Sequence, residues 1–180
     1  MSDNPTSAEN QQERLIETGW VVGFVDGEGC FSINLVRQAG SETRKGYKTG
    51  YQVGHSFAVV QGARSIETLH ALRAFFGVGT LCVNRRRDSH KEDLYRYCVT
   101  RRDDLTRVII PFFREHQLRT AKRLDFEKFA YCIELMAEGH HLTIEGLIEV
   151  IEVAQTMNHR KSRVNVIRIL RDHTPNIPRG

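Results

Sequence analysis

The sequence predicts an α+β fold with an αββαββα core, in which helices cover one face of a four-stranded antiparallel sheet. Two observations carry this prediction. Helical spacing of apolar residues alternates with strand-like alternation in the order helix, strand, strand, helix, strand, strand, helix. Further helical segments follow this core, so the sheet has enough apolar helix surface to cover one of its faces.

The first half of the predicted core consists of one helix and two strands. A helix is expected from about Gln11 to Asp26, followed by a strand over 30–37 in which Phe31, Ile33 and Leu35 share one face. A polar loop leads to a long second strand over about 47–61, whose other face carries small and polar residues. That face is poor core and is available for binding.

The second half contains another helix, a hairpin and the C-terminal helices. Ser65 is a suitable N-cap for the helix, and Gly77 is a suitable stop. Thr143 is an N-cap for a later helix. The remaining expected elements are strands over 78–86 and 93–101 and helices over 103–113, 120–137 and 163–171. We expect a disordered leader over 1–10, one domain over 11–171 and a tail over 172–180.

The composition is that of an ordinary globular protein. Of the 180 residues, 40% are hydrophobic and 27% are charged. No apolar run reaches membrane-spanning length, and the polar start lacks the layout of a signal peptide. The four cysteines form no Cys-x-x-Cys pair, which argues against a zinc knuckle. We therefore expect a cytoplasmic protein, or an organellar matrix protein if an organelle encodes it, with no membrane partner.

The net charge of +4 is modest, but the basic residues are clustered outside the apolar segments. A charge cluster is usually only a solvated face, whereas several clusters beside predicted strands favour phosphate binding. The clusters are 85–87, Arg101 with Arg102, Arg119 with Lys122 and Arg123, and Arg160 with Lys161 and Arg163.

The end of the first helix is the most informative segment of the chain. Gly19, Gly23 and Gly27 recur every four residues, so they lie on one helix face and leave room for another backbone. Asp26 and Glu28 stand at the C-terminal end of the same helix. Carboxylates and backbone carbonyls are the oxygen ligands that Mg²⁺ prefers. The segment thus combines a helix-packing surface with a candidate metal site.

Each half of this motif also has an ordinary structural explanation. Small residues spaced by four occur in many packed helices, and an acid-glycine sequence can simply end a helix before a turn. The two halves in this order, followed by a strand, are much more specific. The segment 22–29, with the sequence VGFVDGEG, resembles the signature of the LAGLIDADG homing endonucleases. Glu28 stands where many family members carry Asp, and either carboxylate can hold a divalent cation.

The resemblance implies a saddle-shaped sheet and a dimeric enzyme. One copy of the motif is present, and single-motif members of the family act as homodimers. The partner helices are expected to pair through Gly19, Trp20 and Gly23. Glu28 and the carbonyl of Gly27 are expected to hold Mg²⁺, with two or three ions shared at the dimer axis.

The resemblance also implies roles for residues outside the motif. Family enzymes place a polar residue after the second strand and a basic residue beyond the third helix. Gln61 fits the first position, and Lys122 or Arg119 fits the second. Both basic residues also suit a solvated helix face, and the choice between them stays open. Asp26 is expected to have a lesser, structural role at the helix end.

Polar side chains on the strand faces are the candidate DNA contacts. Arg, Asn and Gln can make paired hydrogen bonds to base edges, although an ordinary solvated strand face looks the same in a sequence. The candidates are Ser32, Asn34 and Arg37 on the first strand, Gln52 and Ser56 on the second, Asn84, Arg85, Arg96 and Thr100 in the second hairpin, and Arg160 and Lys161 near the C-terminus.

By resemblance, the expected function is that of an intron-encoded homing endonuclease. It would make a metal-dependent staggered double-strand break in a long, pseudo-palindromic DNA site, and its partners would be double-stranded DNA and a second copy of the chain. The alternative is an intron RNA maturase, or a catalytically degenerate DNA-binding protein of the same fold. The presence of Glu28 favours the enzyme.

Overall fold

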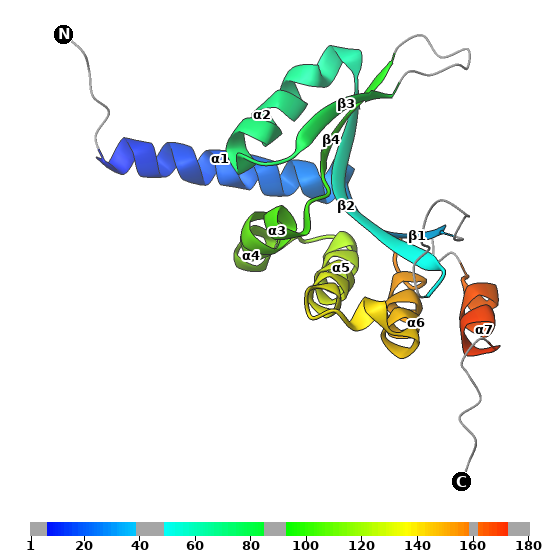
Figure 1. Ribbon diagram of the computed structural model, residues 1–180. Helices are drawn as coiled ribbons and strands as arrows, with labels where there is room; N and C mark the ends of the chain where they lie inside the picture. Colours follow the sequence, from blue (N-terminus) through cyan, green and yellow to red (C-terminus); the bar gives the residue numbers. More distant parts are fainter. Residues whose placement is uncertain (1–6, 39–48, 85–92, 159–161, 173–180) are drawn as a thin grey trace. The chain divides into compact units, whose positions relative to one another are not determined.

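The computed structural model describes residues 7–38, 49–84, 93–158 and 162–172, and it confirms the α+β fold (Figure 1). The sheet has four antiparallel strands in the order β1-β2-β4-β3. They are β1 (Gly29–Arg37), β2 (Tyr51–Gly62), β3 (Thr80–Asn84) and β4 (Leu94–Val99). The chain divides into two compact units, Met1–Cys30 with Phe57–Arg123, and Phe31–Ser56 with Leu124–Gly180.

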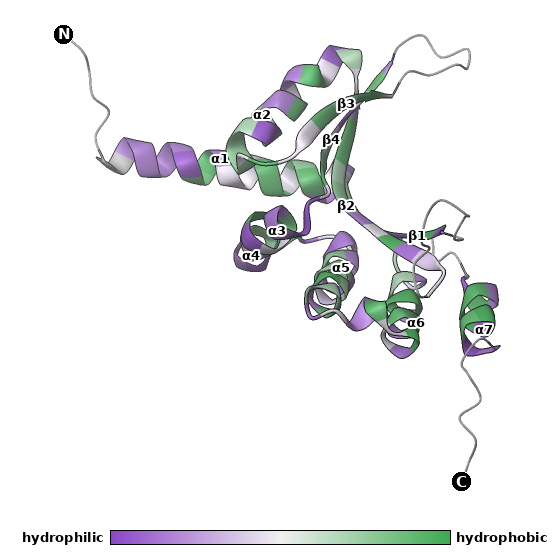
Figure 2. Cartoon of the chain, viewed as in Figure 1, coloured by the Kyte–Doolittle hydropathy of each residue, from purple (hydrophilic) through white to green (hydrophobic). Residues whose placement is uncertain are grey.

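Helix α1 (Ser7–Glu28) begins four residues before the predicted start and ends two residues after the predicted end. Its 22 residues give it a length of about 33 Å. The N-terminal half is hydrophilic and the C-terminal half hydrophobic, as the hydropathy colouring shows (Figure 2). Val21 and Val25 are completely buried, so the C-terminal half of α1 contributes to the core.

The first unit is built around an aromatic cluster. Helix α2 (Ile66–Phe76) follows the short η1 (Ala63–Ser65), lies along the β3–β4 hairpin (Figure 1), and stops at Gly77 in the left-handed conformation, as predicted. The ring of Phe57 lies 5.7–6.1 Å from three other rings at T-shaped angles, a favourable aromatic arrangement. The three partners are Phe76, Tyr97 and Phe113.

The helix predicted over 103–113 is interrupted. It divides into α3 (Arg102–Asp104), a π-helical turn η2 (Leu105–Ile109) and α4 (Ile110–Glu115). Pro111 supplies the physical reason, because it has no N–H and its ring clashes with the carbonyl four residues earlier. A wider turn before the proline relieves that clash.

The second unit contains the C-terminal helices and their core. These are α5 (Lys122–Ala137), η3 (His140–Leu142), α6 (Ile144–Ala154) and α7 (Val164–Asp172), with the first two residues of α5 belonging to the first unit. Phe31 packs against Phe126 and Phe129, with ring centroids 5.2 and 5.5 Å apart. Thr143 caps α6 as predicted, since its hydroxyl accepts a hydrogen bond of 3.1 Å from the Gly146 N–H.

Two side chains near α7 cover the edge strand β1. The Asn158 amide donates to the carbonyl of Phe31 at 2.9 Å, and the Arg163 guanidinium donates to that of Ile33 at 2.7 Å. The sequence places Arg163 in a basic cluster that is expected to bind phosphate. Here its side chain is half-buried, and that burial lowers the pKa of Arg163 despite the opposing effect of Cys132. Its contact with β1 protects an edge that would otherwise present unpaired backbone groups.

The helices that the structure describes include none that combines the length and the apolar character needed to cross a membrane.

Candidate active site

Asp26 binds the segment that leads into α5. Its carboxylate accepts hydrogen bonds from the backbone N–H of Arg119 at 2.9 Å and of Thr120 at 3.1 and 3.2 Å. The Thr120 hydroxyl donates a further bond of 2.6 Å. This carboxylate therefore joins two parts of the first unit that are more than 90 residues apart in the sequence.

Lys122 completes the attachment from the other side. Its ammonium group donates to the carbonyl of Val25 at 3.0 Å and to that of Gly27 at 2.9 Å. The last carbonyls of a helix have no partner within the helix, and they carry the negative end of its dipole. A lysine ammonium is therefore a favourable cap for the end of α1.

These contacts decide the protonation of Asp26. Burial alone raises the pKa of this carboxyl group, but the hydrogen bonds from Thr120 and Arg119 and the charge of Lys122 outweigh it. The net result is a pKa below the ordinary value. Asp26 is consequently ionised and fully engaged in holding the helix end, in agreement with the structural role expected for it.

Glu28 is placed quite differently from Asp26. It is the last residue of α1, it is exposed, and its side chain makes no hydrogen bond or ion pair with any part of the chain that the structure describes. Gly29 follows it in a tight space, since a Cβ there would lie 2.6 Å from the Val25 side chain. The helix therefore passes directly into β1 at a residue that must be small, and this passage leaves the Glu28 carboxylate in solvent.

The glycine face of α1 is uncovered in a single chain. A Cβ built on Gly19, Gly23 or Gly27 would meet no atom within 4 Å. Three apolar side chains belong to the same exposed part of the helix, Leu15 at 70%, Ile16 at 66% and Trp20 at 39% exposure. A bare, partly apolar helix face of this kind is suited to close packing against another helix.

The oxygen donors at this helix end suit a hard divalent cation in type but not in number. Within the described residues, no three His, Cys, Asp or Glu side chains are grouped closely enough to hold a metal ion. The remaining donors are the exposed carboxylate of Glu28 and the carbonyl of Gly27, which also accepts a hydrogen bond from Lys122. The carboxylate of Asp26 is engaged by Thr120. Mg²⁺ needs six ligands in a near-octahedral arrangement, so these two donors do not complete its coordination.

The other residues expected at the active site lie in different surroundings. Gln61 is half-buried on β2 opposite Tyr95 of β4, and its side chain makes no hydrogen bond with a described residue. The Arg119 side chain is exposed, and its backbone, rather than its guanidinium, contacts Asp26. Of the two basic candidates, it is therefore the side chain of Lys122 that reaches the end of α1.

Three of the proposed DNA contacts on β1 and β2 are exposed, and two are paired with each other. Asn34, Arg37 and Gln52 are exposed, and Gln52 accepts a hydrogen bond from the Gln38 amide. Ser32 and Ser56 share a hydrogen bond of 3.0 Å, and Ser56 is only 5% exposed.

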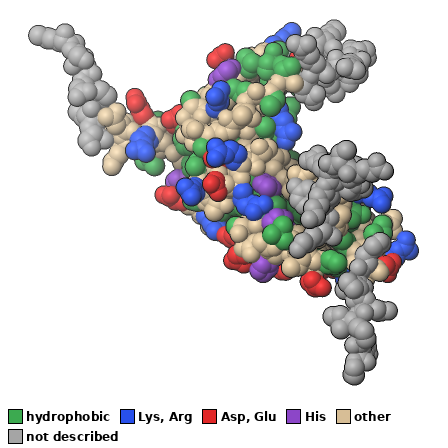
Figure 3. All heavy atoms as spheres, viewed as in Figure 1, with side chains coloured by type: hydrophobic (Ala, Val, Ile, Leu, Met, Phe, Trp, Pro, Cys, Tyr) green, Lys and Arg blue, Asp and Glu red, His purple; other side chains and the backbone are tan. Residues whose placement is uncertain are grey.

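The remaining DNA candidates lie on the second hairpin or outside the described residues. Arg96 on β4 is half-buried and Thr100 is exposed. Arg85, Arg160 and Lys161, and the side chain of Asn84, lie outside what the structure describes. Acidic and basic side chains are interspersed on the visible face of the molecule (Figure 3).

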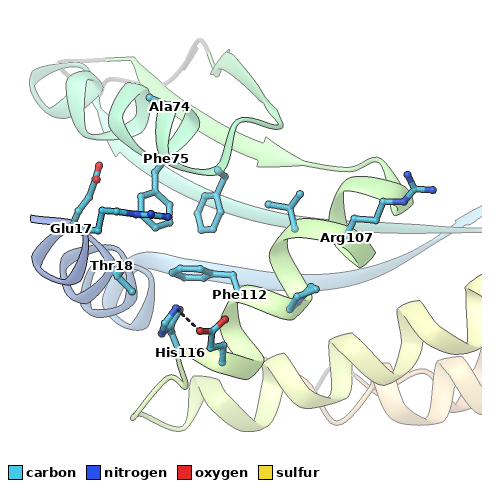
Figure 4. Close-up of a pocket in the computed structure, with 12 residues that line it drawn as sticks. Glu17, Thr18, Ala74, Phe75, Arg107, Phe112 and His116 are labelled. Atoms are coloured by element: carbon cyan, nitrogen blue, oxygen red, sulfur yellow. Dashed lines mark ion pairs between the residues drawn. The ribbon is translucent and has the colours of Figure 1, made fainter. Parts of the chain in front are cut away.

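A cavity in the first unit lies apart from the predicted site residues. It has a volume of about 660 Å³ and includes Phe75 and Phe112 together with charged residues of α1 and α4 (Figure 4). His116 forms an ion pair of 3.8 Å with Glu115 at its edge. None of the residues predicted from the sequence to bind metal or DNA contributes to its lining.

Comparison with known proteins identifies the family. The LAGLIDADG endonuclease family profile matches residues 21–133. The probable intron-encoded endonuclease 2 of Neurospora crassa is 29% identical over 138 residues, which cover 77% of this chain and 26% of the relative. The chain spans about a quarter of the length of the first curated relatives that it matches.

Solved structures of the same kind resemble the fold. The homing endonuclease I-TnaI is 41% identical with a TM-score of 0.69, covering 86% of this chain and 96% of that chain. I-SmaMI bound to an uncleaved DNA target in the presence of calcium ions is 28% identical with a TM-score of 0.70, covering 86% and 48%. The names of these relatives describe endonucleases, and the solved structures share the α+β fold of this chain. The present chain belongs to the LAGLIDADG endonuclease family.

The role of Asp26 gives a first prediction. Replacing Asp26 with Ala should lower the free energy of unfolding by about 1–2 kcal/mol at pH 7, a value reduced for partial exposure. Because the pKa of Asp26 is lowered in the folded protein, its stabilising effect is present above the unfolded pKa of about 3.9 and is lost as the pH falls through the folded value. Urea unfolding at pH 7 and at pH 3 measures both effects.

The exposed Glu127 provides the control for this prediction, because Glu127→Ala should change the stability by less than about 0.5 kcal/mol. An Asp26→Ala effect that is equally large at both pH values would contradict the account.

Proposed function

We propose that this chain is a site-specific homing endonuclease that cuts both strands of DNA as a homodimer with Mg²⁺. The observation that carries the proposal is that the two acids at the end of α1 have different surroundings. Asp26 is engaged in structure, while the neighbouring Glu28 is exposed and has no partner among the described residues. A carboxylate side chain that the fold leaves without a partner at such a position is available to bind a metal ion.

The open glycine face supports pairing of two chains. In a two-fold dimer built on Gly19 and Gly23, the α1 helices approach closely and Trp20 lies at the edge of the contact. Each helix ends at its own Glu28, so the dimer brings two carboxylates toward one axis. A two-fold protein reads a roughly palindromic site, in keeping with a long pseudo-palindromic target.

The carboxylate of Glu28 and the carbonyl of Gly27 would hold Mg²⁺ at the axis, with two or three ions shared between the chains. When bound, such ions supply an activated water and neutralise charge at the scissile phosphate. The role of this chain is to hold Glu28 at a fixed place. It does so through the bonds from Thr120 to Asp26 and from Lys122 to the helix carbonyls. Gln61 is proposed to position water at the same site.

The polar strand residues would contact the DNA. Asn34, Arg37 and Gln52 are exposed and carry groups that form paired hydrogen bonds with base edges, and Thr100 is exposed on the second hairpin. Ser32 and Arg96 are proposed as partly covered contacts. The bond between Ser32 and Ser56, and the burial of Ser56, make Ser56 a support for Ser32 rather than a base contact. The remaining candidates, proposed from the sequence alone, are Asn84, Arg85, Arg160 and Lys161.

Cleavage of the intronless insertion site of the gene tests the proposal. Purified protein with Mg²⁺ should cut this duplex to leave staggered ends, and EDTA should stop the reaction. Glu28→Gln should lower the cleavage rate by about 10³-fold or more, because it removes the charge that holds the metal during the reaction. Binding of the duplex should persist, since the contacts on the strands are unchanged.

Glu17→Gln is the matched control, an identical change at an exposed position of the same helix, and it should leave the rate unchanged. Tight binding of the duplex without any cutting would refute the enzyme and favour a degenerate DNA-binding protein. Preferential binding of the intron RNA would favour the maturase.

The dimer gives a separate prediction. Gly23→Leu should weaken self-association by about 10–100-fold, because overpacking a close contact costs about 1–3 kcal/mol. The fold of the single chain should survive, since a Cβ at Gly23 would meet nothing within 4 Å beyond the helix backbone and Leu favours helix over Gly. Sedimentation velocity measures the association, and circular dichroism measures the fold.

Ala71 is an exposed position of α2, so Ala71→Leu adds apolar bulk away from α1 and should leave association unchanged. A Gly23→Leu protein that associates as the wild type does would exclude the glycine face as the interface.

A further inference from the structure

The ammonium group of Lys122 occupies a position that the proposed metal would also need. It lies 2.9 Å from the carbonyl oxygen of Gly27 and 3.0 Å from that of Val25. Both contacts are of ordinary hydrogen-bond length, and both oxygens belong to the last turn of α1. The Gly27 oxygen is also the backbone atom that is proposed to bind the cation.

A carbonyl oxygen has two lone pairs, so geometry alone does not prevent it from binding two cations. Charge does. Mg²⁺ binds oxygen at about 2.1 Å, and an ammonium bonded to the same oxygen would stand roughly 4 Å from the metal. A divalent and a monovalent cation at that separation repel each other strongly, even with the screening found at a protein surface. The ammonium group and the divalent metal therefore cannot both bind the Gly27 carbonyl oxygen tightly.

We infer that Lys122 acts as a resident cation at the end of α1, which a divalent metal must displace from the Gly27 carbonyl in order to bind. This inference rests on the proposed role of Gly27 as a metal ligand. Its consequence is that the DNA-free protein holds divalent metal weakly, because part of the binding energy is spent on moving the lysine.

The local structure allows such a displacement without disturbing the fold. The backbone of Lys122 is fixed, since its N–H donates to the Thr120 hydroxyl at 3.2 Å and that hydroxyl is bonded to Asp26. The ammonium group stands at the end of a flexible four-carbon chain. The side chain can therefore leave the Gly27 carbonyl while the bonds of Asp26 continue to hold the helix end.

Metal binding to the DNA-free protein tests this inference. Free Mn²⁺ is counted by electron paramagnetic resonance as it is added to wild-type protein and to Lys122→Met, which removes the charge but keeps much of the side-chain volume. The variant should bind Mn²⁺ about 10-fold more tightly, as expected when the metal no longer has to break the bond between an ammonium group and the Gly27 carbonyl. Equal or weaker binding by Lys122→Met would overturn the inference.

Lys128 provides a closely matched control on the same helix. Its ammonium also donates to a backbone carbonyl, that of Thr156 at 3.1 Å, and Lys128→Met changes the protein charge by the same amount. This variant should bind Mn²⁺ as the wild type does. A gain as large as that of Lys122→Met would overturn the inference, because it would show a general charge effect.

Two further variants locate the effect and guard against misfolding. Adding Glu28→Gln to Lys122→Met should abolish the gain, and a gain that persists would place the metal elsewhere and overturn the inference. Lys122→Gln keeps a hydrogen-bond donor for the helix carbonyls while it removes the charge, so it should also bind Mn²⁺ more tightly even if Lys122→Met does not fold. No DNA is present, so the outcome is separate from that of the cleavage experiment.

Discussion

The candidate site depends on the hydrogen bonds that Asp26 accepts from Arg119 and Thr120. They attach the end of α1 to the segment before α5 and fix where the helix stops. Lys122 adds to this attachment by capping the helix carbonyls. The last carbonyls of a helix have no partner within the helix. Without these contacts, the last turn of α1 would therefore be free to fray, and only its hydrophobic half holds the helix to the core. With them, the direction in which Glu28 leaves the helix is determined by a rigid part of the first unit.

This arrangement assigns different tasks to two acids separated by one residue. Asp26 gains several hydrogen bonds and a lowered pKa, so its ionised carboxylate stabilises the folded state. Glu28 gains nothing from the fold, and its carboxylate remains in water. The exposed glycine face has the same character, because a Cβ at Gly19, Gly23 or Gly27 would meet nothing within 4 Å beyond the backbone of its own helix. The glycine face is proposed to pack against a second chain, and Glu28 is proposed to bind a metal. A single chain gives neither of them a partner among the described residues.

Much of this could be predicted from the sequence, because the signals are local. Gly77 ends α2, Thr143 caps α6, and the alternation of β3 and β4 places both strands in register as a hairpin. Other features depend on partners distant in the chain. Thr120 carries no local signal for its bond to Asp26, and the covering of β1 by Asn158 and Arg163 joins residues about 130 positions apart. The apolar spacing over 103–113 predicts one continuous helix and not the π-helical turn before Pro111, although the proline itself is a local signal.

The claim that Asp26 is structural while Glu28 binds metal can be tested directly by anomalous diffraction at the manganese edge. The crystals would contain the protein and its insertion-site duplex, grown with Mn²⁺. The account predicts anomalous peaks beside the Glu28 carboxylate and the Gly27 carbonyl, with the Asp26 carboxylate still bonded to Thr120. A peak coordinated by Asp26 after its release from Thr120, with none at Glu28, would contradict it.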